Sequence, residues 1–353
     1  MSSQAKNLTL WIDDLLNPQR VLEAAGELKS LQLPALNRLL NRADYHTTSA
    51  RSLESLGSYL FHQPQALPSA VTKAAAQCDL NEQQLEEFWL SVDPVQMVPD
   101  RDTLVLIPSS DLGITEEESL ALLKSFNTHF AEDGLELHFG SATQWYLSLK
   151  QAVDVQSTPL AQAAYQSLNE RYPQGNAGNY WRQLMNETQM LFYNHDVNHD
   201  RRMQDLPEIN SIWVWGEGML NRDQLVMRPN AAVFSDDAYL QGVARLTDAR
   251  FAPSVSSFAA WQEQVTVQDQ NALATLNLAS DYGVALEQMT LQQWLELLAR
   301  LEEEWFEPML KALEQKQLNS VLLAMGANKH YLLQPSMLKR FWRFKKSWTA
   351  LVN

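Results

Sequence analysis

The sequence has little cysteine and no long apolar run. Cys78 is the single cysteine among the 353 residues, so an intrachain disulfide cannot form. No window approaches the roughly 18 consecutive apolar residues of a transmembrane helix, and the first residues lack the apolar stretch of a signal peptide. We therefore expect a cytoplasmic protein without a membrane span.

Positive charge is also scarce. Lys and Arg number 27 against 42 Asp and Glu, which gives a net charge of −15 at pH 7. Proteins that bind duplex nucleic acid usually carry a basic face, so this balance argues against such a partner. The motifs of three common enzyme classes are missing as well: the GxSxG nucleophile elbow, the P-loop and the dinucleotide-binding GxGxxG.

The pattern of apolar residues changes near residue 93. Before it, apolar residues recur at spacings of three and four, which predicts short helices after a possible first strand at Leu8–Ile12. After it, β-branched apolar runs such as Thr103–Pro108 predict buried strands. We expect a helix-rich N-terminal part, residues 1–92, and an α/β part, residues 93–353.

Two helices are predicted with some detail. Thr115 and Glu118 fit a capping box at the start of a helix that runs to Phe130. A long helix is predicted over Leu291–Gln315, strained at Pro308, with the three glutamates 302–304 on its wet face.

The densest polar segment is 195–202. In a helix, His195 and His199 would lie on one face, four residues apart, which is the spacing of a zinc site. The zinc-binding HExxH helix has Glu after the first His, whereas this chain has Asp196, and Asn198 is more typical of turns. A solvated, turn-forming segment is the alternative.

A second motif, residues 210–218, reads Asn-Ser-Ile-Trp-Val-Trp-Gly-Glu-Gly. Trp213 and Trp215 alternate along a predicted strand and therefore point to the same face. Gly216 and Gly218 permit a positive φ or a close approach of backbone to a ligand. A buried aromatic face followed by a plain turn is the alternative.

Segments along nearly the whole chain resemble the RpfE-type regulatory protein family, a bacterial family of uncharacterised biochemistry. The resemblance implies a regulatory protein. It is carried by residues 8–18, 33–40, 93–97, 100–104, 144–149, 181–190, 195–201, 210–218 and 340–342.

A partial resemblance, over residues 185–250, is to the archaeal-type cofactor-independent phosphoglycerate mutases of the alkaline-phosphatase superfamily. Those enzymes carry H-P-x-N-x-x-R and then N-x-I-W-x-W-G-x-G, which this chain matches with His195, Asn198, Arg201 and residues 210–218, aspartate replacing the proline. The resemblance implies an α/β fold with a mixed sheet and flanking helices. It also implies an enzyme with two divalent metals and a phosphorylated serine intermediate.

The metal ligands of such an enzyme are incomplete in the sequence. A two-metal phosphomutase needs several carboxylates and histidines. Asp13 follows the possible first strand, where one ligand would lie, but after Arg202 the only histidine is His330. We therefore predict a non-catalytic relative, a pseudoenzyme without a cofactor, that binds a phosphorylated or carboxylated small molecule in a regulatory role.

The predicted site uses Arg201 as a bidentate clamp on the anionic group, with hydrogen bonds from His195 and Asn198 and a floor formed by the tryptophan strand. The predicted ligand-binding residues are His195, Asn198, Arg201, Asn210, Trp213, Trp215, Gly216 and Gly218.

Two alternatives stay open. The first is a metal-dependent phosphoglycerate mutase or phosphoesterase, with manganese or another divalent metal held by Asp13 or Asp14, His195 and His199. The second is a protein-interaction module that binds a protein partner through the tryptophan-rich surface or through the basic, aromatic segment 338–348.

Overall fold

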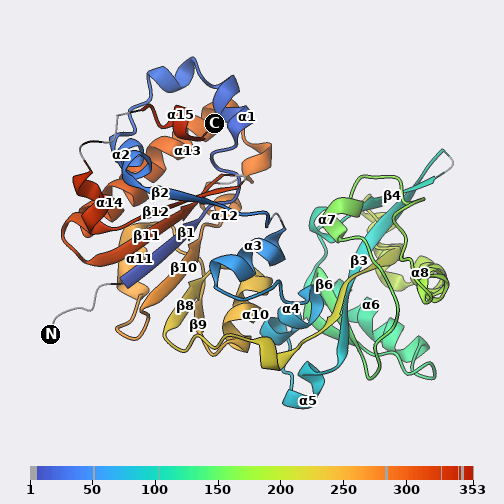
Figure 1. Ribbon diagram of the computed structural model, residues 1–353. Helices are drawn as coiled ribbons and strands as arrows, with labels where there is room; N and C mark the ends of the chain where they lie inside the picture. Colours follow the sequence, from blue (N-terminus) through green and yellow to red (C-terminus); the bar gives the residue numbers. More distant parts are fainter. Residues whose placement is uncertain are drawn as a thin grey trace. The chain divides into compact units, whose positions relative to one another are not determined.

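The computed structural model describes residues 6–352 except 51, 102, 283, 284, 327, 341 and 343–345. The chain forms two compact units (Figure 1): unit 1 comprises Met1–Ala66 and Val226–Asn353, and unit 2 comprises Leu67–Leu225. The boundary predicted between residues 92 and 93 falls inside one strand, β3 (Phe88–Asp100). The division differs because unit 1 is completed by a C-terminal part of the chain, which no local pattern reveals.

Unit 1 is built on a seven-stranded mixed sheet with the order β2-β12-β11-β1-β10-β8-β9. Strands β11, β1, β10, β8 and β9 pair parallel to one another, whereas β12 pairs antiparallel with both β11 and β2. The strands are β1 (Lys6–Trp11), β2 (Asp44–Thr47), β8 (Ala231–Phe234), β9 (Arg250–Ala252), β10 (Asn271–Thr275), β11 (Leu318–Ala324) and β12 (Lys329–Leu333).

The two faces of this sheet are covered by different helices. Leu8 and Leu10 enter the larger core, which helices α2, α11, α13 and α14 complete. Trp11 points to the other face, where α3 and α10 meet; a Cβ on Gly57 would lie only 2.7 Å from Leu240, so glycine permits their contact. The helices of unit 1 are α1 (Pro18–Glu23), α2 (Pro34–Arg42), α3 (Leu53–Leu60), α10 (Ala238–Leu246), α11 (Phe258–Gln264), α12 (Leu278–Tyr282), α13 (Leu291–Leu301), α14 (Glu307–Glu314) and α15 (Thr349–Val352).

Unit 2 carries an antiparallel sheet with the order β4-β3-β6-β5, and β7 pairs with β3. Its core includes Trp145, Trp181 and Trp213. The capping box predicted at Thr115 and Glu118 is confirmed at the start of α6. The elements are β3, β4 (Thr103–Ile107), β5 (Leu137–Ser141), β6 (Gln144–Leu149), β7 (Ser211–Met219), α4 (Ser69–Gln77), α5 (Glu82–Leu85), α6 (Glu116–His129), α7 (Leu160–Ala163), α8 (Gly178–Tyr193) and α9 (Asp196–Met203).

Within the described ranges, no helix is long and apolar enough to cross a membrane.

The long C-terminal helix is divided by a π-helical turn, Glu302–Phe306, between α13 and α14. Proline lacks an N–H group and its ring clashes with the carbonyl four residues earlier, so the helix widens just before Pro308. The wider turn directs Glu302 inward, and its side chain is buried. The prediction that Glu302 lies on the solvent-exposed face of the helix is therefore wrong. Its carboxylate accepts hydrogen bonds from the N–H groups of Ala35 and Leu36, and so caps α2, whose own N-cap residue offers no side-chain acceptor.

This buried cap predicts a loss of stability in Glu302→Ala. The N–H groups of Ala35 and Leu36 lose their acceptor, which costs about 2 kcal/mol of unfolding free energy. Urea-induced unfolding followed by tryptophan fluorescence measures the loss. Glu303→Ala, at an exposed position, is the control and should change the free energy by less than about 0.5 kcal/mol. Equal, small effects of both substitutions would contradict the capping role.

Candidate functional site

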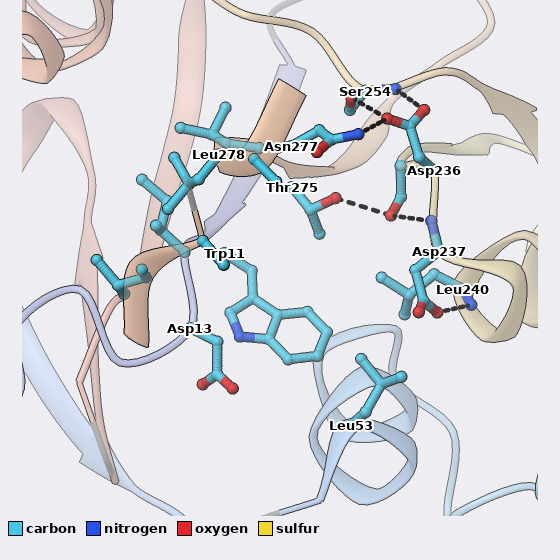
Figure 2. A pocket seen from close by; sticks show the side chains of 16 residues that line it. Trp11, Asp13, Leu53, Asp236, Asp237, Leu240, Ser254, Thr275, Asn277 and Leu278 are labelled. Atoms are coloured by element: carbon cyan, nitrogen blue, oxygen red, sulfur yellow. Dashed lines mark hydrogen bonds between the residues drawn. The ribbon is translucent and has the colours of Figure 1, made fainter. Parts of the chain in front are cut away.

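A cavity of about 380 Å³ lies at the carboxyl ends of the central parallel strands of unit 1 (Figure 2). Asp13 follows β1, Asp236 and Asp237 follow β8, and Asn277 follows β10, and all four line the cavity. Parallel strands bring their carboxyl ends to one edge of a sheet, and ligands of open α/β folds bind at that edge. We call this space the carboxyl-edge cavity.

Asp236 is held by its neighbours in this cavity. Its carboxylate accepts hydrogen bonds from the hydroxyl and the N–H of Ser254, at 2.6 and 3.0 Å, and from the amide of Asn277 at 2.8 Å. Burial by itself would raise the pKa of Asp236, but these hydrogen bonds lower it below its ordinary value. Asp236 is therefore a charged group whose oxygens already have partners within the protein.

The residues on either side of Asp236 also have structural partners. The buried hydroxyl of Ser235 accepts hydrogen bonds from the Thr275 hydroxyl, at 2.7 Å, and from the N–H of Asp237. Asp237 is the N-cap residue of α10, and its carboxylate accepts from the N–H of Leu240 at 3.0 Å. Figure 2 shows this network on one side of the cavity and Asp13 beside Trp11, away from Asp236.

The potential metal ligands of the carboxyl-edge cavity do not fit a two-metal centre. In the part of the chain that the structure describes, no three His, Cys, Asp or Glu side chains are grouped so that they could hold a metal ion. Asp13 and Asp14 belong to unit 1, whereas His195 and His199 belong to unit 2. The metal set of the first alternative therefore draws on both units, and a metal role for these residues stays a prediction.

The predicted anion clamp, Arg201, is a buried residue of α9 with 1% of its surface exposed. Its Nη1 lies 2.9 Å from both carboxylate oxygens of Glu118, its Nε donates to the carbonyl of Pro207 at 2.6 Å, and its Nη2 donates to the carbonyl of Leu112. Burial alone raises the pKa of Glu118, but the bonds from Thr115 and Arg201 lower it overall. An external anion could reach Arg201 only if this network opened.

Two asparagines of the predicted site also use their side-chain amides for hydrogen bonds within the protein. Asn198 is fully buried; it donates to the carbonyls of Phe192 and Ile209 and accepts from the N–H of Ile209 at 2.8 Å. Asn210 accepts from the N–H of Met97 and donates to its carbonyl, at 2.8 and 3.0 Å. Both side chains therefore join segments of unit 2 that are distant in sequence.

The two tryptophans of β7 are buried. Trp213 donates its indole N–H to the carbonyl of Thr158 at 2.9 Å, and Trp215 donates to the carboxylate of Asp93 at 2.6 Å. The ammonium group of Lys73 lies 4.2 Å from the centre of the Trp215 ring. Neither tryptophan forms an exposed surface of unit 2.

The remaining predicted residues serve turns and close packing. Gly216 has a φ of +70°, and a Cβ on Gly218 would lie 2.7 Å from Pro68, so the glycines let β7 approach the start of α4. His195 is the N-cap of α9, and its ring nitrogen accepts from the N–H of Val197. All eight predicted residues thus lie in unit 2 in contacts within the protein, and a ligand role for them stays a prediction.

The basic segment of the second alternative is described only in part. Arg340 pairs with Asp44 at 2.7 Å and Trp342 is 65% exposed. Residues 341 and 343–345 lie outside the described residues.

Of the polar residues of the carboxyl-edge cavity, sequence reasoning found Asp13 but missed Asp236, Asp237 and Asn277. A signal for Asp236 is present in the sequence, because the short apolar run Ala231–Phe234 is typical of a buried strand and the aspartates follow it. The signal for Asn277 was absent, because β10 is short and alanine-rich and was not predicted as a strand.

Sequence comparison relates the chain to phosphoglycerate mutases. No known family profile matches it. Over 107 residues it is 25% identical to the 2,3-bisphosphoglycerate-independent phosphoglycerate mutase of Methanosarcina barkeri, covering 30% of this chain and 27% of that protein. Over 132 residues it is 26% identical to a probable enzyme of the same name from Geobacter sulfurreducens, covering 37% and 33%. The matches thus span a third or less of the length of these curated relatives.

Solved structures show the fold along almost the whole chain. A cofactor-independent phosphoglycerate mutase from Thermoplasma acidophilum superposes with a TM-score of 0.56 at 11% identity, covering 99% of this chain and 95% of that one. A protein from Pyrococcus horikoshii gives a TM-score of 0.58 at 12% identity, covering 94% and 88%. The predicted fold class, a mixed sheet with flanking helices related to these mutases, is confirmed. Membership of the RpfE-type family stays a prediction.

The contacts of Arg201 predict that Arg201→Ala destabilises the protein. The substitution leaves Glu118 without its cation and two carbonyls without donors, which costs about 3 kcal/mol of unfolding free energy. Urea-induced unfolding measures this change. Arg202→Ala is the control, because Arg202 is 38% exposed and pairs with Glu208, and it should cost less than about 1 kcal/mol. Stability equal to wild type in Arg201→Ala would contradict the structural role.

The buried carboxyl of Asp93 predicts a pH dependence. Burial raises its pKa to about 6, and the hydrogen bond from Trp215 and the charge of Lys73 offset only part of this effect. The folded protein therefore holds this proton more tightly than the unfolded chain does. The resulting stabilisation is present below about pH 4, is lost as the pH rises through about 6, and amounts to about 3 kcal/mol.

Asp93→Asn should remove this dependence while keeping an acceptor for the Trp215 N–H. Relative to the variant, wild type should lose stability between about pH 4 and 7 in urea-induced unfolding. Asp79→Asn, at an exposed position of unit 2, is the control and should follow wild type. Parallel pH profiles of wild type and Asp93→Asn would refute the buried, proton-holding state.

Proposed function

We propose that this chain is a non-catalytic relative of the cofactor-independent phosphoglycerate mutases that binds a phosphorylated or carboxylated small molecule in a regulatory role. The shared fold and the two segment matches support the relationship to these mutases. The regulatory role is the one that the resemblance to the RpfE-type family implies.

The polar side chains that line the carboxyl-edge cavity are the main support for the proposal that the protein is non-catalytic. Phosphoryl transfer through two divalent metals requires clustered carboxylates and histidines, which neutralise and orient the transferring group through the metals. Asp236 is hydrogen-bonded to Ser254 and Asn277, Asp237 caps α10, and no histidine that the structure describes lines the cavity. Asp236 and Asp237 are thus used in hydrogen bonds within the protein, which supports a relative without the two-metal chemistry.

The negative charge of the carboxyl-edge cavity also affects where an anionic ligand can bind. Asp13, Asp236 and Asp237 contribute negative charge, and among the residues that the structure describes no Lys or Arg lines the cavity. Without metal ions between them, carboxylates repel a phosphate group. The anionic part of the ligand therefore needs a cation elsewhere in the protein.

The proposal predicts binding without turnover. In EDTA, a phosphorylated three-carbon acid should raise the melting temperature; at 100 times the dissociation constant the stabilisation is about 2.7 kcal/mol. With millimolar Mn²⁺, the protein should neither interconvert phosphoglycerates nor hydrolyse a phosphomonoester.

The matched variants are Asp13→Asn and Asp236→Asn, with Asp223→Asn, exposed in unit 2, as the control. Mn²⁺-dependent turnover that disappears in Asp13→Asn and Asp236→Asn but persists in the control would establish the enzyme instead. If no phosphorylated or carboxylated compound raises the melting temperature, the binding role is wrong.

A further inference from the structure

Unit 1 contains a second cavity, of about 250 Å³, on the face of the sheet opposite the larger core. Asn7 and Thr9 of β1 line it and alternate with the core residues Leu8 and Leu10. Leu60, at the end of α3, also lines it, whereas Leu53, at the start of the same helix, lines the carboxyl-edge cavity. The two cavities therefore lie at opposite ends of α3, and we call the second one the α3-end cavity.

We propose that the α3-end cavity binds the anionic group, phosphate or carboxylate, of a small molecule, with Arg228 as its cation and His62 and Asn271 as further hydrogen-bond donors. This assignment rests on the proposed function and gives it a binding site.

Arg228 is a cation without a counterion among the residues that the structure describes. Its guanidinium forms no ion pair or hydrogen bond with any residue that the structure describes, and its nearest recorded interaction is with the Phe61 ring, 5.8 Å away. The residue is partly buried, and burial lowers the pKa of Arg228. A partly desolvated charge without a partner is costly, and an anion that enters the cavity removes this cost.

The lining of the cavity has the opposite charge to that of the carboxyl-edge cavity. Arg228 and His62 line the α3-end cavity, and no Asp or Glu in the described part of the chain does. The described lining of the carboxyl-edge cavity contains three aspartates and no Lys, Arg or His. The chain as a whole has a net charge of −15 and repels anions. A cavity lined by Arg228 and His62 can attract an anion locally.

The floor of the cavity is a chain of oriented amides. Ser320 donates its hydroxyl to the carbonyl oxygen of the Asn7 side chain at 2.8 Å, and Asn7 donates to the side-chain oxygen of Asn271 at 2.9 Å. These two bonds direct the NH₂ group of Asn271 away from Asn7. No acceptor for that group is recorded among the described residues, so it is available to a ligand oxygen.

Two hydrogen bonds between Gln63 and Val226 hold the neighbouring residues His62 and Arg228 at the same cavity. The buried side chain of Gln63 donates to the carbonyl of Val226 at 2.9 Å and accepts from its N–H at 3.0 Å. His62 itself is exposed and has a left-handed backbone, with a φ of 59°. Although the residue as a whole is exposed, the partial burial of its ring and then the charge of Arg228 lower the pKa of His62, so its neutral ring offers one N–H near pH 7.

The size of the cavity restricts the ligand. Its volume is below the range of about 300–1,000 Å³ that is typical of drug-sized ligands. It suits inorganic phosphate, or the charged group of a small phosphorylated or carboxylated metabolite, better than a nucleotide.

Isothermal titration calorimetry in EDTA tests the site with three probes: inorganic phosphate, 3-phosphoglycerate and glycerate. We expect Arg228→Gln to weaken binding of the anion by about tenfold or more. Because Arg228 has no recorded partner, the melting temperature of the ligand-free variant should stay at the wild-type value or rise. Arg245→Gln, an exposed arginine of α10 outside the cavity, is the control and should bind as wild type does.

The three probes separate the sources of the anion. Arg228-dependent binding of phosphate and 3-phosphoglycerate assigns the cavity to a phosphoryl group, and Arg228-dependent binding of glycerate assigns it to a carboxylate. Binding of 3-phosphoglycerate that is equal in wild type and Arg228→Gln would overturn this site and leave the proposed function standing. If none of the probes binds wild type, the site and the proposed binding role both fail, while Mn²⁺-dependent turnover alone would overturn only the non-catalytic function.

Discussion

The parallel pairing of β1 with β10 on one side and β11 on the other is the constraint on which unit 1 depends. It places the N-terminal strand at the centre of a sheet whose neighbours come from the C-terminal part of the chain. Unit 2 is therefore an insertion, and the chain crosses twice between the units. Together with the parallel pairing of β10 and β8, the pairing of β1 brings the ends of β1, β8 and β10 to one edge, where the carboxyl-edge cavity forms.

One strand also serves both cavities of unit 1. Asp13 follows the end of β1 in the carboxyl-edge cavity, and Asn7 at its beginning contributes to the floor of the α3-end cavity. The first cavity is acidic, while the second has Arg228 without a recorded counterion. Under the proposed function, a phosphorylated ligand is favoured at the α3 end and repelled at the carboxyl edge, where a metal-dependent phosphomutase would need its cations.

The resemblance to the phosphoglycerate mutases implied the fold class, and several local elements could be predicted because they depend on nearby residues. Thr115 and Glu118 mark the start of α6, and alternation along Ser211–Trp215 predicts β7. The site was harder to predict, because burial decides whether a polar side chain binds a ligand or the protein. Arg201 and Glu118 are 83 residues apart and no local pattern pairs them. The partners of β1 and the inward turn of Glu302 likewise depend on tertiary packing.

A crystal structure grown with Mn²⁺ and 3-phosphoglycerate, with anomalous scattering measured at the manganese edge, tests the central claim most directly. The claim predicts density for a phosphate group against Arg228 and no pair of manganese peaks at the carboxyl-edge cavity. Two manganese peaks beside Asp13 and Asp236, with the phosphate between them, would contradict it.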